Sequence, residues 1–355
     1  MCDKSIAREL EDVTMSIVIK NSSGEPISRV LVIDKTPRYA KSTSDPIAMI
    51  SIPPNSAVTI SYKVKLLAPG THTFSDVVII VSDFLGYFAE ELSYSDRLTV
   101  VALPQEIRGE LGMKSLQKVV GVYTAGKAVG GLYDLANIRD YTPGDNVKKI
   151  IWSAYAKTGK LVVREDLGET RAKILLLIDI RPHAWLIGET PNTLAHIQLR
   201  FAASLVNFLT RNGMEVDAIV CSGIMPKVVA NLRGGEESLY RIFSLIDAGG
   251  GCNSQLNGFI NAIGYIDKEL SQYDIAILLT NPITLSLDEP TNLRGLVTSL
   301  ERLFIAMPMF KYDNVMGRDD IAKLLNGVSE TLGETLIGME FSEEGFEIIY
   351  GGEKP

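Results

Sequence analysis

Two hydrophobic patterns divide the chain. From about Val13 to Val101, apolar and polar residues alternate over short runs, as at Met15, Ile17 and Ile19. Alternation with a period of two is typical of strands that bury one face, and turn-forming residues interrupt the runs every 8–12 residues or so. The pattern predicts an antiparallel β-sandwich of about six or seven strands, Ig-like but without the paired Cys and Trp of antibody domains.

The pattern changes at Lys173. Ile174 to Ile178 is a nearly continuous apolar run, as in a parallel strand buried on both faces. Between Thr193 and Arg211 apolar residues recur every three or four positions and a glycine follows, which predicts a helix and its end. Further strands are predicted at 216–221, 274–280, 303–307 and 346–350, and helices at 236–246, 256–270 and 319–332. This alternation predicts a doubly wound, largely parallel α/β sheet.

The chain of 355 residues is therefore expected to contain a β-sandwich at 1–104, a linker and motif region at 105–172, and an α/β domain at 173–355. That length suits two or three domains. Glycines recur between 102 and 135, which is typical of loops. The sequence contains no internal repeat.

Composition limits the classes of function. The chain is 46% hydrophobic and 22% charged, with a formal net charge of −8, so it resembles a soluble globular protein with no general attraction to nucleic acid or anionic membranes. No run of about 18 apolar residues occurs, and the start lacks the apolar core of a signal peptide. We expect a soluble, cytoplasmic chain.

The three cysteines are Cys2, Cys221 and Cys252. So few, and an odd number, predict a reducing compartment and no disulfide framework. No cluster of Cys and His has the spacing of a structural zinc site. We therefore expect no bound zinc.

An unusual motif lies between the two patterns. It contains, in order, Arg139, Tyr141, Pro143-Gly144-Asp145, Ile150, Trp152, Ala156, Lys157, Gly159 and Leu161. These residues match the R-x-Y-x-P-G-D … I-x-W-x-x-x-A-R-x-G-x-L segment of the domain-of-unknown-function family DUF58, with Lys157 in place of its arginine. The segment Asp83 to Phe88 resembles the D-P-x-G-L-F sequence that closes the family's β-domain. The chain thus resembles, over most of its length, von Willebrand factor A-like proteins often encoded beside MoxR-type AAA+ ATPases.

This resemblance implies a von Willebrand factor A-like α/β domain and a protein partner, a MoxR-type AAA+ ATPase, in the assembly or maturation of other proteins. The family usually carries two membrane helices ahead of its β-domain, and this chain begins where they would end. We expect any membrane association to come through segments outside this chain, in a longer form. No cofactor and no nucleic-acid partner are expected.

The resemblance also directs attention to three loops at the carboxyl ends of the strands. Von Willebrand factor A domains with a metal site have D-x-S-x-S in the first loop, where this chain has Asp179, Arg181 and His183. A guanidinium is always charged and has no lone pair, so Arg181 is expected to pair with Asp179 instead of sharing it with Mg²⁺. A transition metal held by His183 and Asp179 is an alternative.

The other two loops also depart from the family pattern. Residues 249–254 lack a threonine at the expected position, and Asn281 replaces the aspartate of the third loop. Mg²⁺ requires hard oxygen ligands in a near-octahedral array, and this set offers few. We therefore predict a metal-free binding face made of Asp179, Arg181, His183, Cys252, Asn253, Thr280 and Asn281.

Two interpretations of the central motif remain open. In the first, Arg139 pairs with Asp140 or Asp145 and Trp152 fills the junction between the domains. In the second, the motif residues Arg139, Tyr141, Asp145 and Trp152 form an interaction surface, because residues 139–173 include eight basic and five acidic residues. The first is preferred for Arg139 and Trp152, while a solvated face and a partner surface are equally expected for the lysines.

No constellation of residues indicates a reaction. Nucleophilic catalysis needs a nucleophile beside an oriented base, and Ser222 or Cys252 with His183 or His196 has no supporting motif. GxSxG and the phosphate-binding GxxxxGK[ST] are both absent from the sequence.

Two hypotheses about function follow. A non-catalytic adaptor, which is preferred, predicts that Arg181→Ala weakens partner binding without unfolding. A metal-dependent binding module or hydrolase with a rewired site predicts Mg²⁺ or Mn²⁺ stabilisation that is lost in Asp179→Ala.

Overall fold

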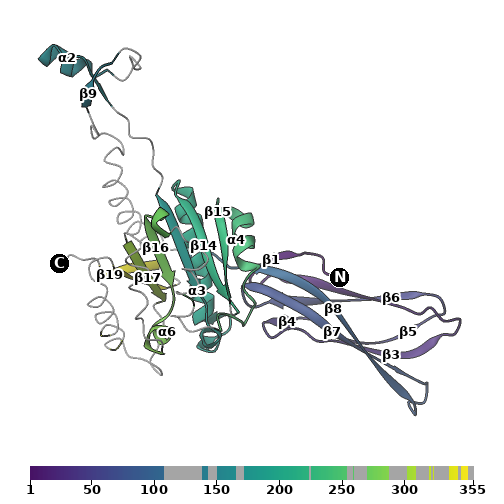
Figure 1. Ribbon diagram of the computed structural model, residues 1–355. Coiled ribbons are helices and arrows are strands. Elements are labelled where there is room, and N and C mark those ends of the chain that lie inside the picture. The colour runs from purple at the N-terminus through teal and green to yellow at the C-terminus, as the bar shows by residue number, and fades with distance from the viewer. Residues whose placement is uncertain are drawn as a thin grey trace.

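The computed structural model describes residues 1–107, 138–142, 150–164, 172–223, 225–253, 259, 270–287, 302–308, 320, 323, 336–342 and 345–350. Strands dominate these residues, in an N-terminal group of sheets and a larger sheet beside it (Figure 1). The helices predicted at 256–270 and 319–332 lie almost entirely outside the described residues, as does the glycine-rich part of the linker.

The N-terminal region contains two sheets packed face to face. Their strands are β1 (Ile6–Arg8), β2 (Asp12–Lys20), β3 (Ile27–Asp34), β4 (Ala40–Ser42), β5 (Ile47–Ile52), β6 (Ala57–Leu66), β7 (Gly70–Ser82) and β8 (Ala89–Leu103). One sheet has the order β1-β8-β7-β3-β5 and the other β2-β6-β4. All pairs are antiparallel except β1 with β8. The predicted alternation is present: Val13 and Met15 of β2 are buried with Val64 of β6 between the sheets.

The β7–β8 hairpin ends in an apolar turn that no described residue covers. Phe84, Leu85, Tyr87 and Phe88 are each more than two-thirds exposed. The turn itself is ordered by hydrogen bonds, because Asp83 N donates to Phe88 O and Phe88 N donates to Asp83 Oδ1, at 3.1 and 3.0 Å. The hairpin projects away from the larger sheet (Figure 1).

Within the described residues, the larger sheet has seven strands in the order β15-β14-β11-β16-β17-β18-β19. They are β11 (Lys173–Asp179), β14 (Glu215–Ser222), β15 (Met225–Leu232), β16 (Ile275–Leu279), β17 (Arg302–Pro308), β18 (Leu336–Ser342) and β19 (Gly345–Tyr350). The five inner strands are parallel to one another: β14, β11, β16, β17 and β18. Strands β15 and β19 pair antiparallel with them at the two edges. The predicted apolar run 174–178 lies in β11, and these five residues are fully buried. The sheet is therefore largely parallel, as predicted.

Helices accompany this sheet. Helix α3 (Leu194–Arg211) follows N-cap Thr193 and ends at Asn212, where Gly213 takes a positive φ of 77°, so the predicted helix and its glycine stop are confirmed. Helix α4 (Gly235–Phe243) and the short α6 (Pro282–Leu287) follow β15 and β16. A 3₁₀ turn, η2 (Pro182–Trp185), follows β11. None of the described helices is both long and apolar enough to cross a membrane.

A tryptophan does fill the junction between the two sheet regions, but it is Trp185. The Tyr39 ring lies 5.2 Å from the Trp185 ring, which in turn lies 5.2 Å from the His196 ring (centroid distances). Trp152, predicted to fill this place, is 58% exposed on helix α2 (Trp152–Thr158) and contacts Tyr155 edge-on. That interpretation of Trp152 is therefore wrong. Helix α2 lies away from both sheet regions in Figure 1.

A buried ion pair joins the same two regions. Arg200 of α3 donates from Nε and Nη2 to the two carboxylate oxygens of Glu9, at 3.0 and 2.7 Å. Both side chains are buried. His196 Nε2, one turn earlier on α3, bonds Leu67 O at 2.9 Å. Helix α3 thus holds the β region through charged, polar and aromatic contacts at once.

Candidate functional site

The strand order defines where this α/β region would bind a ligand. Strand β11 is central, the chain next forms β14 and β15 on one side, and it then crosses to β16, β17 and β18 on the other. In such open sheets, ligands bind outside the carboxyl ends of the strands where the order reverses. Asp179 ends β11 and Thr280 directly follows β16. We call this part of the sheet the carboxyl edge.

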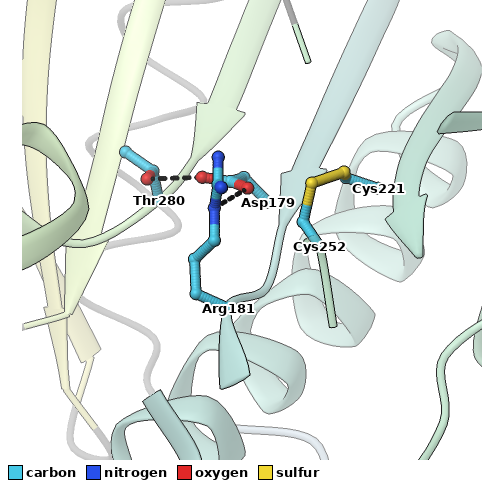
Figure 2. Close-up of a disulfide and its surroundings, with 5 residues drawn as sticks. All are labelled: Asp179, Arg181, Cys221, Cys252 and Thr280. Atoms are coloured by element: carbon cyan, nitrogen blue, oxygen red, sulfur yellow. Dashed lines mark hydrogen bonds and ion pairs between the residues drawn. A yellow bond between two sulfur atoms is a disulfide. The ribbon is translucent and has the colours of Figure 1, made fainter. Parts of the chain in front are cut away.

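The Asp179 carboxylate is held from two sides at the carboxyl edge (Figure 2). Thr280 Oγ1 donates to Asp179 Oδ2 at 3.0 Å. Arg181 Nε lies 2.6 Å from Asp179 Oδ1 in an ion pair. Asp179 is fully buried and Arg181 is only 6% exposed. The predicted pairing of Arg181 with Asp179 is confirmed, and the carboxylate is neutralised inside the protein.

Beside this carboxylate, Cys221 and Cys252 form a disulfide (Figure 2). Their Cα atoms are 5.0 Å apart, and 31 positions separate them in the sequence. Cys221 lies near the end of β14 in register with Asp179. The prediction of no disulfide is therefore wrong. The remaining cysteine, Cys2, is free and half-buried in the β region.

Cys252 belongs to residues 249–253, which we call the edge loop. Its backbone is tied to the sheet because Cys252 N donates to Ile180 O at 2.7 Å and Asn253 N donates to Gly223 O at 2.7 Å. Gly251 has a φ of 157°, and a Cβ there would lie 2.3 Å from Ile180 O. Only glycine lets the loop approach the end of β11 this closely.

A metal would meet poor ligands at the carboxyl edge. One oxygen of Asp179 and the two cysteine sulfurs lie within 4.8 Å of one another. However, the sulfurs are bonded to each other, and thiolates are the form that binds metals. Asp179 is already paired with Arg181, whose charge opposes a second cation. The described residues fit a metal poorly.

His183 and Asn281 form a second, separate group. Asn281 Oδ1 accepts from Thr284 N at 2.9 Å and so caps helix α6. His183 Nε2 lies 3.4 Å from both Asn281 Oδ1 and Thr284 Oγ1. His183 is therefore engaged with α6, a place that the sequence did not indicate.

Burial separates the predicted face into a scaffold and a surface. Asp179, Arg181, Cys252, Thr280 and Asn281 are buried, His183 is half-buried and Asn253 is exposed. The first five can shape this face but cannot form much of its contact area.

Sequence reasoning missed the exposed residues of η2 and the turn after it. Pro182 is exposed and Leu186 is 64% exposed. An apolar residue directly after a buried Trp185 gives no sign in the sequence that it faces solvent. Leu186, which directly follows η2 after the end of β11, is an exposed apolar side chain that a partner can reach.

Burial also changes the expected effect of Arg181→Ala. This substitution would leave the Asp179 carboxylate buried without its countercharge, which typically destabilises a protein by about 3–5 kcal/mol. A loss of partner binding in that variant would not distinguish a contact from damage to the fold. Surface residues give the cleaner test.

The central motif is only partly described. Strand β9 (Ile138–Asp140) pairs antiparallel with β10 (Val162–Arg164), and Tyr141 N extends the pair by donating to Leu161 O at 2.9 Å. Asp145 lies outside the described residues, so its predicted pairing with Arg139 stays a prediction. The motif residues and the carboxyl edge are thus built by different elements.

Comparison with known proteins gives one family match. The model of the family described as "Protein of unknown function DUF58" matches residues 137–301. This range includes the central motif from Arg139 onward and the carboxyl edge from Asp179 to Asn281. No curated protein matches the chain.

Three solved structures show how remote the structural likenesses are. The cupredoxin domain of amoB from Nitrosocaldus yellowstonii is 9% identical, covers 29% of this chain and 82% of its own, and has a TM-score of 0.22. A FixG-related protein from Vibrio parahaemolyticus is 12% identical, and the match covers 26% of this chain and 78% of that protein with a TM-score of 0.18. A beta-glucuronidase from Bacteroides uniformis is 10% identical, and the match covers 95% of this chain and 38% of that enzyme with a TM-score of 0.18. Likenesses this low carry no argument about fold or function.

Proposed function

Because this chain belongs to the DUF58 family, we propose that it is a non-catalytic protein-interaction module. Its partner in this proposal is a MoxR-type AAA+ ATPase, and its role is in the assembly or maturation of protein complexes. The α/β region would be a von Willebrand factor A-like domain and the β region an Ig-like support. The strand order around β11 is in keeping with that assignment.

One observation carries the proposal: the Asp179 carboxylate is enclosed between Arg181 and Thr280. An enclosed, neutralised carboxylate is poorly placed for acid–base chemistry or for binding Mg²⁺. The same contacts hold the surrounding backbone in one shape. Such a rigid edge, with an exposed apolar residue at Leu186, suits recognition of another protein.

The alternative is a metal-dependent binding module or hydrolase at the same edge. In its favour, Asp179 and two cysteine sulfurs lie close together. Against it, the ion pair with Arg181 must break before a cation can bind Asp179. A rise in melting temperature with Mg²⁺ or Mn²⁺ that disappears in Asp179→Ala would support this alternative over the adaptor.

The adaptor proposal is tested with the purified chain and the MoxR-type ATPase of the same cell, by biolayer interferometry. Leu186→Ala is expected to weaken binding at least tenfold, because exposed apolar anchors supply much of an interface's affinity. Met49→Ala is the matched control, since Met49 of β5 in the N-terminal β region is 57% exposed and Leu186 64%. Equal losses in both variants, or no binding of the wild-type chain, would contradict the proposal.

A further inference from the structure

We propose that Cys221 and Cys252 form a reversible redox switch that sets the position of the edge loop. Both residues are buried beside Asp179 and are joined by a disulfide. Disulfides of proteins kept in a reducing compartment are usually transient and serve redox sensing or catalysis, and this chain keeps its third cysteine, Cys2, as a free thiol. The consequence for partner binding rests on the proposed function, whereas the movement of the loop does not.

The backbone at Cys221 is fixed more rigidly than the backbone at Cys252. Cys221 lies within the sheet, in register with Asp179 on one side and Pro226 of β15 on the other. Cys252 lies in the edge loop. Among the described residues, backbone hydrogen bonds tie this loop to the sheet, from Cys252 N to Ile180 O, Gly223 N to Gly251 O and Asn253 N to Gly223 O, and Trp185 Nε1 donates to Gly250 O at 2.6 Å. A force between the sulfurs therefore moves the loop, because the strand is fixed by both neighbours.

Breaking the disulfide creates such a force. Bonded sulfurs are about 2.05 Å apart, whereas unbonded atoms of this size need roughly 3.5–4 Å. Cys221 and Cys252 are almost completely buried, and protein interiors have few voids to absorb the difference. Reduction should push Cys252 away from β14 and weaken the bonds of Cys252 and Asn253 to the sheet. Asn253 is exposed at the binding face, so that face changes shape.

The redox step requires a dithiol reductant. One thiolate of the reductant attacks a cysteine sulfur, forms a mixed disulfide and releases the other cysteine as a thiolate, which takes up a proton. The second thiol of the reductant then closes its own disulfide and releases the first cysteine. Two electrons and two protons pass to Cys221 and Cys252. The attack must wait for opening of the edge loop, so reduction should be much slower in the folded chain than in denaturant.

Thiol counting tests whether the pair exists in solution. The chain is equilibrated with oxidised glutathione, quenched in acid, denatured and alkylated, and its mass is measured. We expect one alkylated thiol, Cys2, and three after dithiothreitol, because Cys2 is the free cysteine and the other two are bonded. In Cys2→Ser the counts should be none and two. Three thiols in the glutathione-treated wild type would overturn the proposal.

Hydrogen exchange tests the movement. In the reduced chain, the amides of Cys252 and Asn253 should exchange at least tenfold faster than in the oxidised chain, while β2 and β6 serve as an internal reference. Cys221→Ser/Cys252→Ser should exchange like the reduced wild type, and if it does not fold, the dithiothreitol-treated wild type alone decides. Equal exchange of the edge loop in both redox states would overturn the switch.

Binding to the ATPase separates this inference from the proposed function. We expect the reduced chain to bind at least tenfold more weakly than the oxidised chain, with Cys2→Ser behaving like the wild type. If neither redox state binds while exchange still differs, the proposed function fails and the switch stands. Equal affinity in both states, with a loop that moves, would overturn control of the binding face.

Discussion

His196 has both ring nitrogens engaged in a fully buried place. Nε2 lies 2.9 Å from Leu67 O, and Nδ1 lies 2.6 Å from Thr193 Oγ1. A carbonyl oxygen only accepts, so Nε2 carries the proton and Nδ1 accepts from the threonine hydroxyl. Burial lowers the pKa of His196 to about 4, the Leu67 carbonyl acts in the opposite direction, and Arg200 lowers it further. The native state therefore requires neutral imidazole.

This pKa predicts a loss of stability in mild acid. An unfolded histidine has a pKa near 6.5, so the unfolded state binds the proton first. The contribution of His196 is complete above about pH 6.5 and is lost as the pH falls towards 4, by up to about 1.4 kcal/mol per pH unit. Burial also lowers the pKa of His72, which adds to the effect with the same sign. Urea denaturation between pH 5 and 7.5 measures the slope.

Substitution separates the two histidines. His196→Gln should reduce that slope without abolishing it, because the buried His72 still titrates with the same sign. A slope that does not change in His196→Gln would contradict this account of the buried imidazole.

At the scale of elements, the sequence predicts those whose pattern is strong over many residues. Strand β11 and helix α3 lie close to their predicted bounds. A continuous apolar run, or apolar residues with a period of 3.6, is compatible with few other types of secondary structure. The edge strand β15 and strand β18 were not predicted. Their runs are short and interrupted by Pro226, Asn231 or Gly338, residues that oppose a strand unless neighbouring strands enforce it.

The carboxyl edge could be predicted only in part for the same reason. Asp179 and Arg181 are two positions apart, so their pairing follows from local chemistry. The disulfide joins Cys221 to Cys252 across 31 positions. Its formation depends on how β14 aligns with β11 and on how the edge loop returns to the end of β11. No local sequence pattern indicates that the edge loop returns to the end of β11.

Gly251 tests how tightly the edge loop is docked. In Gly251→Ala, the new Cβ would lie 2.3 Å from Ile180 O in a backbone with a φ of 157°, so both overlap and backbone strain oppose the native loop. We expect a loss of at least about 2 kcal/mol in the free energy of unfolding, measured by urea titration. Gly24→Ala is the control because nothing lies within 4 Å of its Cβ. Equal stability of the two variants would show that the loop is free to shift.

At the scale of the whole molecule, the junction was the least predictable feature. Both tryptophans were available to fill it, and the choice of Trp185 depends on Tyr39, which lies 146 positions earlier and donates a hydrogen bond to Trp185 O. The other junction residues also come from distant segments, such as Thr71, which is bridged to Asp247. The junction joins the β region to the segment that leads into the edge loop.

The buried Glu9–Arg200 pair predicts that the two regions unfold together. Arg200→Ala would leave Glu9 buried without its partner and should lower the free energy of unfolding by about 3–5 kcal/mol. Arg8→Ala is the control: its ion pair with Glu236 also spans the junction but is exposed, so the loss should stay below about 1 kcal/mol. Calorimetry should show one transition for the wild type and for Arg8→Ala. In Arg200→Ala the β region, which loses its firmest tie to α3, should melt first in a separate transition. A single unshifted transition in Arg200→Ala would mean that the aromatic contacts of Tyr39 and Trp185 alone couple the regions.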